Sequence, residues 1–349
     1  MTTGWFDRLH TALNARGWKP SILQTRSGRL LITEHNARLF AIEIDGLEHN
    51  AVWHDPAHED PNSGAGLIGG DRLWIAPEVA YYWDSLELAR QDPGGNARNP
   101  PQVDPGHYTK TQNSDQTLSY HATVELTDSR VDKSIRFEVQ RSFRVAQSLP
   151  ALPPEVRCLS FALDNQLTLT AGDDGALAGG WSICQLPTGG TLHCPTPIRA
   201  PSVTSYYDPF ENRVEIDDTG VRFRVDGQAK IKMGLPAETT TGRMGYYRET
   251  GSGAVLLLRA FPTLPGEPYV DVPISAPADQ RYGTDVLQAY NHDGGPNTFG
   301  EMEYHDPAII VGAQPQSRSG TSVTHALFGP IDQVKAVGET FLGMKLRLI

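Results

Sequence analysis

The chain has few cysteines and no long apolar run. Its three cysteines are Cys158, Cys184 and Cys194, an odd number without the C-x-x-C or Cys/His spacing of a zinc site. We expect them to be buried, reduced thiols. No window reaches the ~18 apolar residues of a membrane span, and residues 1–18 lack a basic start followed by an apolar stretch. The sequence therefore predicts a cytoplasmic protein with no membrane partner.

Basic clusters are also missing. The 30 Lys and Arg residues are outnumbered by 41 Asp and Glu residues, which gives a net charge of −11 over 349 residues. Nucleic-acid binding depends on clustered cations that neutralise phosphates, so nucleic acid is not an expected partner. A local basic cleft inside an acidic protein remains compatible with this balance.

Several signatures of common enzyme folds are absent. We find no fixed-length repeat, no alternation of strands and helices, no Walker sequence, no G-x-G-x-x-G after a strand and no G-x-S-x-G elbow. The sequence therefore argues against propellers, solenoids, nucleotide-binding folds and α/β-hydrolases.

Most of the sequence has the pattern of β-strands separated by turns. Apolar residues at helical spacing predict one helix over residues 3–16, and from Ile22 the period changes to two, which predicts an antiparallel meander up to Trp53. Residues 54–70 have the composition of a loop, and residues 90–117 that of a long surface excursion. Residues 118–145 predict a hairpin.

The strand pattern then continues, with no internal helix expected, until residues 331–342 return to helical spacing. We expect some 15 to 20 strands. The predicted fold is all-β: one large antiparallel β-sandwich domain over residues 1–349. Residues 1–20 form a helix and lead-in, 21–330 the sandwich, and 331–349 a helix and tail.

The window 291–307, NHDGGPNTFGEMEYHDP, concentrates polar chemistry. Glu301, Glu303 and His305 share one side of an extended segment because side chains alternate with period two. Charged groups leave water only when they are paired, metal-bound or neutralised, so the window predicts a site. No cofactor is expected; the alternative is a divalent cation held by these three side chains, which would require a bend in the strand.

Two windows resemble the galactose mutarotase-like superfamily, the sandwich fold of aldose 1-epimerases. GGDRLWIAPE (69–78) looks like the segment that carries a substrate-binding arginine, here Arg72, and GEMEYHDPA (300–308) resembles the strand that carries the catalytic glutamate, here Glu301. The resemblance spans residues 22–328 and implies a galactose mutarotase-like supersandwich. It departs at 163–172, LDNQLTLTAG, where the epimerases' acid histidine has no counterpart.

The resemblance implies a sugar or oligosaccharide as the ligand and proton transfer as the chemistry. That chemistry needs one base and one acid, so Glu301 or Glu303 is the candidate base and His292 or His305 the candidate acid. The alternatives are a non-catalytic carbohydrate-binding protein, a lyase or hydrolase on the same fold, and a purely structural network. The sequence leaves the identity of the sugar and the oligomeric state open.

Glu303 is also a candidate for binding the sugar, and so are three more residues. Arg72 offers a planar fork of donors, although it could equally pair with Asp71 or Glu78. Trp74 shares a strand face with Arg72 and could stack on a sugar ring, as could Trp181, although tryptophans in strands also fill cores.

Overall fold

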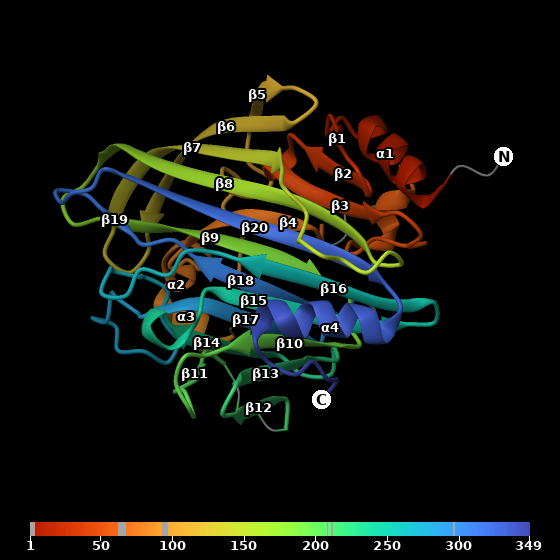
Figure 1. Cartoon of the computed structure of the whole chain (residues 1–349). Coiled ribbons are helices and arrows are strands. Elements are labelled where there is room, and N and C mark those ends of the chain that lie inside the picture. Colours follow the sequence, from red (N-terminus) through yellow and green to blue (C-terminus); the bar gives the residue numbers. More distant parts are fainter. Residues whose placement is uncertain (1–3, 62–67, 93–96, 208, 211, 296) are drawn as a thin grey trace.

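The protein folds into two large antiparallel sheets that pack face to face (Figure 1). The computed structural model describes residues 4–61, 68–92, 97–207, 209–210, 212–295 and 297–349. The first sheet has the order β1 (Ser21–Thr25), β2 (Gly28–Thr33), β3 (Arg38–Ile44), β4 (Asp71–Ala76), β9 (Leu177–Leu186), β18 (Phe299–His305), β17 (Asp285–His292), β14 (Ile231–Pro236) and β11 (Thr204–Ser205), with β19 (Ile309–Ile310) paired to β9.

The second sheet also has ten strands. Its order is β12 (Val214–Asp217), β13 (Gly220–Val225), β10 (Gly190–Pro195), β15 (Arg243–Thr250), β16 (Gly253–Ala260), β20 (Ser317–Gly329), β8 (Arg157–Gly172), β7 (Lys133–Val145), β6 (Thr117–Asp128) and β5 (Thr109–Asn113). The predicted all-β sandwich, its strand number and the hairpin of β6 with β7 are confirmed.

Alternation along the strands builds the core between the sheets. In β6, for example, Val124 and Leu126 are buried while Thr123 and Glu125 face solvent. Apolar side chains of both sheets meet in one continuous cluster, because each sheet must cover one apolar face. The three cysteines are buried and free, as expected.

The two terminal helices each cover part of a sheet. Helix α1 (Trp5–Ala15) buries Phe6, Leu9 and Leu13 against Leu31 and Phe40 of β2 and β3, which confirms the expected amphipathic helix. Helix α4 (Ile331–Leu342) lies over β15 and β16 of the second sheet (Figure 1) and ends at Gly343, whose φ of 70° is easily adopted by glycine. No helix of the described residues is long and apolar enough to cross a membrane.

Three local predictions were wrong. Two short internal helices follow β4, α2 (Glu78–Tyr81) and α3 (Leu86–Gln91). Pro77 has no N–H for a strand ladder, and the Ser85 side chain accepts from the N–H of Leu88 to begin α3. A 3-10 helix, Pro56–Glu59, interrupts the expected loop at 54–70, of which 62–67 lie outside the described residues.

The third correction concerns the excursion at 90–117. Its described part is not all surface: Asp104 is buried, because its carboxylate is compensated by the guanidinium of Arg38 and the indole N–H of Trp74. Residues 93–96 of this segment lie outside the description.

Candidate functional site

A cavity of about 430 Å³ opens on the face of the first sheet that is turned away from the second sheet. Strand alternation decides which side chains reach it. On β18, Met302 and Tyr304 join the core between the sheets, so Glu301, Glu303 and His305 point to the opposite face. On β4, Arg72 and Trp74 share that face and line the cavity. The expected common face of these residues is therefore formed.

Strand register arranges the floor of the cavity in rows. One row crosses four strands, because Lys232 pairs with Tyr290, Tyr290 with Glu301, and Glu301 with Gln185. A second row joins Trp74, Trp181 and His305 across β4, β9 and β18. Directly opposed residues have Cβ atoms about 5 Å apart, so each row brings side chains from distant parts of the sequence into contact.

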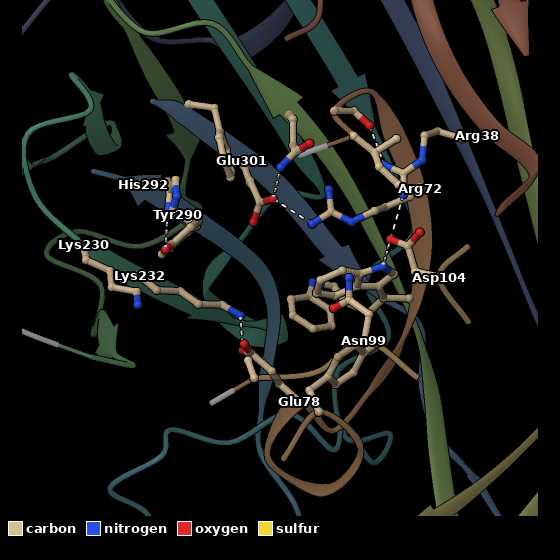
Figure 2. Close-up of a pocket in the computed structure, with 18 of the residues that line it drawn as sticks. Arg38, Arg72, Glu78, Asn99, Asp104, Lys230, Lys232, Tyr290, His292 and Glu301 are labelled. Carbon is tan, nitrogen blue, oxygen red and sulfur yellow. Dashed lines mark hydrogen bonds and ion pairs between the residues drawn. The ribbon is translucent and has the colours of Figure 1, made fainter. Parts of the chain in front are cut away.

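Glu301 is held by one oxygen. Its Oε1 accepts hydrogen bonds from Nη2 of Arg72 at 2.9 Å and from Nε2 of Gln185 at 3.0 Å (Figure 2). Among the described residues, Oε2 has no hydrogen-bond partner. The carboxylate is thus fixed in orientation while one oxygen stays available on the cavity side.

Arg72 and Trp74 form a stacked pair on β4, which is separated from β18 by β9. The guanidinium carbon of Arg72 lies 4.2 Å from the centre of the Trp74 ring. Burial lowers the pKa of Arg72, but the carboxylates of Glu301 and Asp104 outweigh burial, so the pKa is raised. Asp104 fixes the indole of Trp74 by accepting its N–H at 2.9 Å, and it also binds Nη2 of Arg38 at 2.7 Å.

Lys232 lies among three carboxylates beneath the cavity. Its Nζ is 3.0 Å from Glu78, 3.6 Å from Glu303 and 3.8 Å from Asp271. It also lies 4.2 Å from the centre of the Trp181 ring. This buried ammonium therefore holds together three acidic side chains and an indole that forms part of the cavity wall.

Glu303 is fully buried and does not line the cavity. Its Oε2 accepts the indole N–H of Trp181 at 2.7 Å. Burial raises the pKa of Glu303 to about 8, although the positive charge of Lys232 opposes the shift. A carboxyl group with such a pKa keeps its proton at neutral pH.

The two candidate acid histidines occupy different positions. His305 lies behind Trp181, with its ring stacked at 5.4 Å on the indole, and it does not line the cavity. Burial lowers its pKa well below the usual value. His292 does line the cavity; its Nδ1 is 2.9 Å from the hydroxyl of Tyr290, and burial also lowers its pKa.

The cation arrangement of Glu301, Glu303 and His305 is not formed. Within the part of the chain that the structure describes, no three His, Cys, Asp or Glu side chains are grouped as a metal ion would require. Instead, the first two carboxylates bind Arg72 and Trp181, and the imidazole stacks.

Of the residues expected from the sequence, five line the cavity: Arg72, Trp74, Trp181, His292 and Glu301. The sequence interpretation did not include several others, namely Arg38, Glu78, Asp104, Gln185, Tyr207, Lys230, Lys232 and Tyr290. A signal existed for two of them, because Lys230 and Lys232 alternate in KIKMG and must share a strand face. Asp104 lies in an irregular segment and offered no such signal.

The family model described as Family of unknown function (DUF6786) matches residues 55–349, most of the chain. The chain belongs to the DUF6786 family. A comparison with curated proteins found no match to this DUF6786 protein.

Solved structures show which fold the DUF6786 chain has. A galactose mutarotase-like protein from Lactobacillus casei ATCC 334 is 8% identical, with a TM-score of 0.51 over 88% of this chain and 99% of that chain. A galactose mutarotase related enzyme from Lactobacillus acidophilus is 8% identical, with a TM-score of 0.51 over 88% and 97%. An aldose epimerase homologue from C. elegans is 9% identical, with a TM-score of 0.50 over 89% and 99%. The DUF6786 protein thus has the galactose mutarotase-like sandwich fold.

Proposed function

We propose that this DUF6786 protein is a carbohydrate-active enzyme of the epimerase or mutarotase type. The observation that carries the proposal is that Glu301, Arg72 and Trp74 converge on one cavity, with Oε2 of Glu301 unpaired among the described residues. An indole face suits the C–H face of a pyranose, and an arginine fork suits its hydroxyls. The fold shared with galactose mutarotase-like proteins supports the same substrate class.

In the proposed reaction, Glu301 removes the proton of the anomeric hydroxyl while the bond between C1 and the ring oxygen breaks. His292 gives a proton to that ring oxygen, and C1 becomes a carbonyl carbon. After rotation about the bond between C1 and C2, the ring oxygen attacks the other face of C1, and both protons return. Arg72 donates to the Glu301 carboxylate and orients it, and Trp74 and Trp181 form the wall against which the ring lies.

Sugar binding without turnover is the second candidate. The Oε1 atom of Glu301 is already occupied by donors from Arg72 and Gln185, as in a network that only orients a ligand. Residues 163–172 also contain no histidine. Both observations favour a protein that holds a sugar and releases it unchanged.

Glu301→Gln separates the two candidates. If the protein is an enzyme, interconversion of anomers on a panel of mono- and oligosaccharides should fall at least about 100-fold, because the base is lost. Affinity should change little, since the amide oxygen can still accept from Arg72. Magnetisation-exchange NMR measures turnover, and calorimetric titration measures affinity.

Glu48→Gln is the matched control, since this exposed glutamate does not line the cavity and should leave both quantities unchanged. Saturable binding with no turnover of any sugar by the unmodified protein would refute the enzyme and leave the binding protein. Unchanged turnover in Glu301→Gln would refute Glu301 as the base.

A further inference from the structure

One cation of the cavity has no counter-ion. The charged side chains in the lining are Arg38, Arg72, Lys230, Lys232, Glu78, Asp104 and Glu301. Six of them form pairs, Arg38 with Asp104 at 2.7 Å, Arg72 with Glu301 at 2.9 Å and Lys232 with Glu78 at 3.0 Å. Lys230 is half-buried and has no ion-pair or hydrogen-bond partner among the described residues. Among the described lining residues, cations therefore outnumber carboxylates by one; Asp271 and Glu303, which also lie close to Lys232, are outside this lining.

The position of Lys230 follows from the strand register. It directly precedes β14, and alternation places it on the same side as Lys232, about 7 Å further along the strand. Because Ile231 pairs with Asn291, Lys230 stands beside His292. Figure 2 shows Lys230 and His292 on the same side of the cavity, away from Arg72.

Through-space interactions agree with this placement. Burial is the main cause of the lowered pKa of His292; the carboxylate of Glu301 opposes the shift, and the charge of Lys230 lowers the pKa further. Asp293 also opposes the shift but is exposed and does not line the cavity. The ammonium of Lys230 thus lies close enough to His292 to act on its imidazole, and it forms no ion pair with a carboxylate of the described lining.

We infer that the sugar bound in this cavity carries an acidic group, a carboxylate or a phosphate, which pairs with Lys230. This inference rests on the proposed sugar site and adds the substrate class to it. A neutral sugar would leave the ammonium of Lys230 without a counter-ion, whereas an anionic substituent would balance the lining. The protein as a whole carries a net charge of −11, so this cation is not part of a generally basic surface.

Matched pairs of sugars test the inference. We would titrate the protein calorimetrically with glucose, glucuronate and glucose 6-phosphate, with galactose and galacturonate, and with inorganic phosphate alone. The acidic sugars should bind at least about fivefold more tightly than their neutral partners, as one partly exposed ion pair allows. Added salt should reduce this preference. Lys230→Met should abolish it by lowering the affinity for acidic sugars several-fold more than the affinity for their neutral partners, whereas Lys335→Met on α4 should change neither affinity.

The other outcomes contradict the inference in distinguishable ways. Equal affinity for neutral and acidic sugars, or an equal loss of both in Lys230→Met, would overturn it. If, in such a case, the protein still turned over neutral sugars and lost this turnover in Glu301→Gln, the proposed function would remain supported without the inference of an acidic substrate. Inorganic phosphate that bound as tightly as glucose 6-phosphate would point to an anion site without a sugar and overturn the inference. Failure of every sugar to bind would overturn both proposals.

Discussion

Asp71 and Arg72 are adjacent in sequence, yet they belong to two ion clusters on opposite faces of β4. Asp71 points between the sheets, where its carboxylate binds Arg141 of β7 and, at 2.6 Å, Arg259 of β16. All three side chains are 0% exposed. Arg72 points into the cavity and binds Glu301, which is 6% exposed.

The two clusters differ in the surroundings of those polar atoms that form no hydrogen bond among the described residues. In the interior cluster, Nε and Nη1 of Arg141 and Nη1 of Arg259 have no hydrogen-bond partner among the described residues and are sealed from water, so any loss there leaves a charge uncompensated. In the cavity cluster, Nε and Nη1 of Arg72 are likewise buried and unpaired among the described residues, but Oε2 of Glu301, also without such a partner, belongs to a residue that lines open space. Strand β4 thus links the two sheets through Asp71 on one face and holds Glu301 of β18 through Arg72 on the other.

The largest expected effect is on the interior cluster. Asp71→Asn removes the only negative charge of the three residues and leaves two buried guanidinium groups without a counter-ion. We expect a loss of about 3–5 kcal/mol in the free energy of unfolding, measured by chemical denaturation.

Two controls test whether the clusters really differ. Asp45→Asn changes an exposed carboxylate and should stay within about 0.5 kcal/mol of the unmodified protein. Glu301→Gln should cost less stability than Asp71→Asn, because it leaves one guanidinium without its counter-ion rather than two, and the new amide oxygen can still accept from Arg72. Equal losses from Asp71→Asn and Glu301→Gln would show that the two faces of β4 are not specialised.

The sequence predicted the part of this arrangement that depends on local order. Period-two alternation placed Arg72 with Trp74 and placed Glu301, Glu303 and His305 on one face, and the terminal helices followed from apolar spacing. These properties depend on residues a few positions apart.

The partners could not be predicted, because they depend on register between distant strands. Asp71 contacts Arg141 and Arg259, which lie 70 and 188 positions away in the sequence. Lys232 contacts Glu78, which lies 154 positions away. No local pattern distinguishes these arginines and this lysine from others in exposed strands. Asp104 is the residue of the cavity wall that has the weakest signal in the sequence. It lies in an irregular segment, where side-chain direction has no period.

A smaller effect is expected at Asp306, a buried carboxyl group that lacks an arginine. Burial alone raises its pKa to about 7. The folded protein keeps this proton up to about pH 7, whereas the unfolded chain loses it near pH 4. The stability that Asp306 contributes is therefore complete below pH 4 and is lost as the pH rises to 7.

Asp306→Asn should remove this pH dependence, so the free energy of unfolding should fall less between pH 4 and pH 7 than in the unmodified protein. Denaturation at several pH values measures the slope. Burial also raises the pKa values of Asp285 and Glu303, to about 6 and about 8. These two groups therefore contribute a pH dependence of the same sign to both the unmodified protein and the variant. An unchanged slope would mean that Asp306 is ionised in the folded protein.

The smallest effect is expected at His305, which is buried as the interior cluster is but lies on the cavity face of the first sheet and forms no ion pair among the described residues. Both ring nitrogens are buried without a hydrogen-bond partner among the described residues, and the ring stacks on Trp181. A phenyl ring can keep that stacking and removes two unsatisfied polar atoms. We therefore expect His305→Phe to change the free energy of unfolding by less than about 1.5 kcal/mol. Sugar affinity and turnover should stay within about threefold, whereas His292→Phe should lower turnover severely. A loss of turnover in His305→Phe with folding intact would instead assign the acid role to His305 and require that Trp181 moves to expose it.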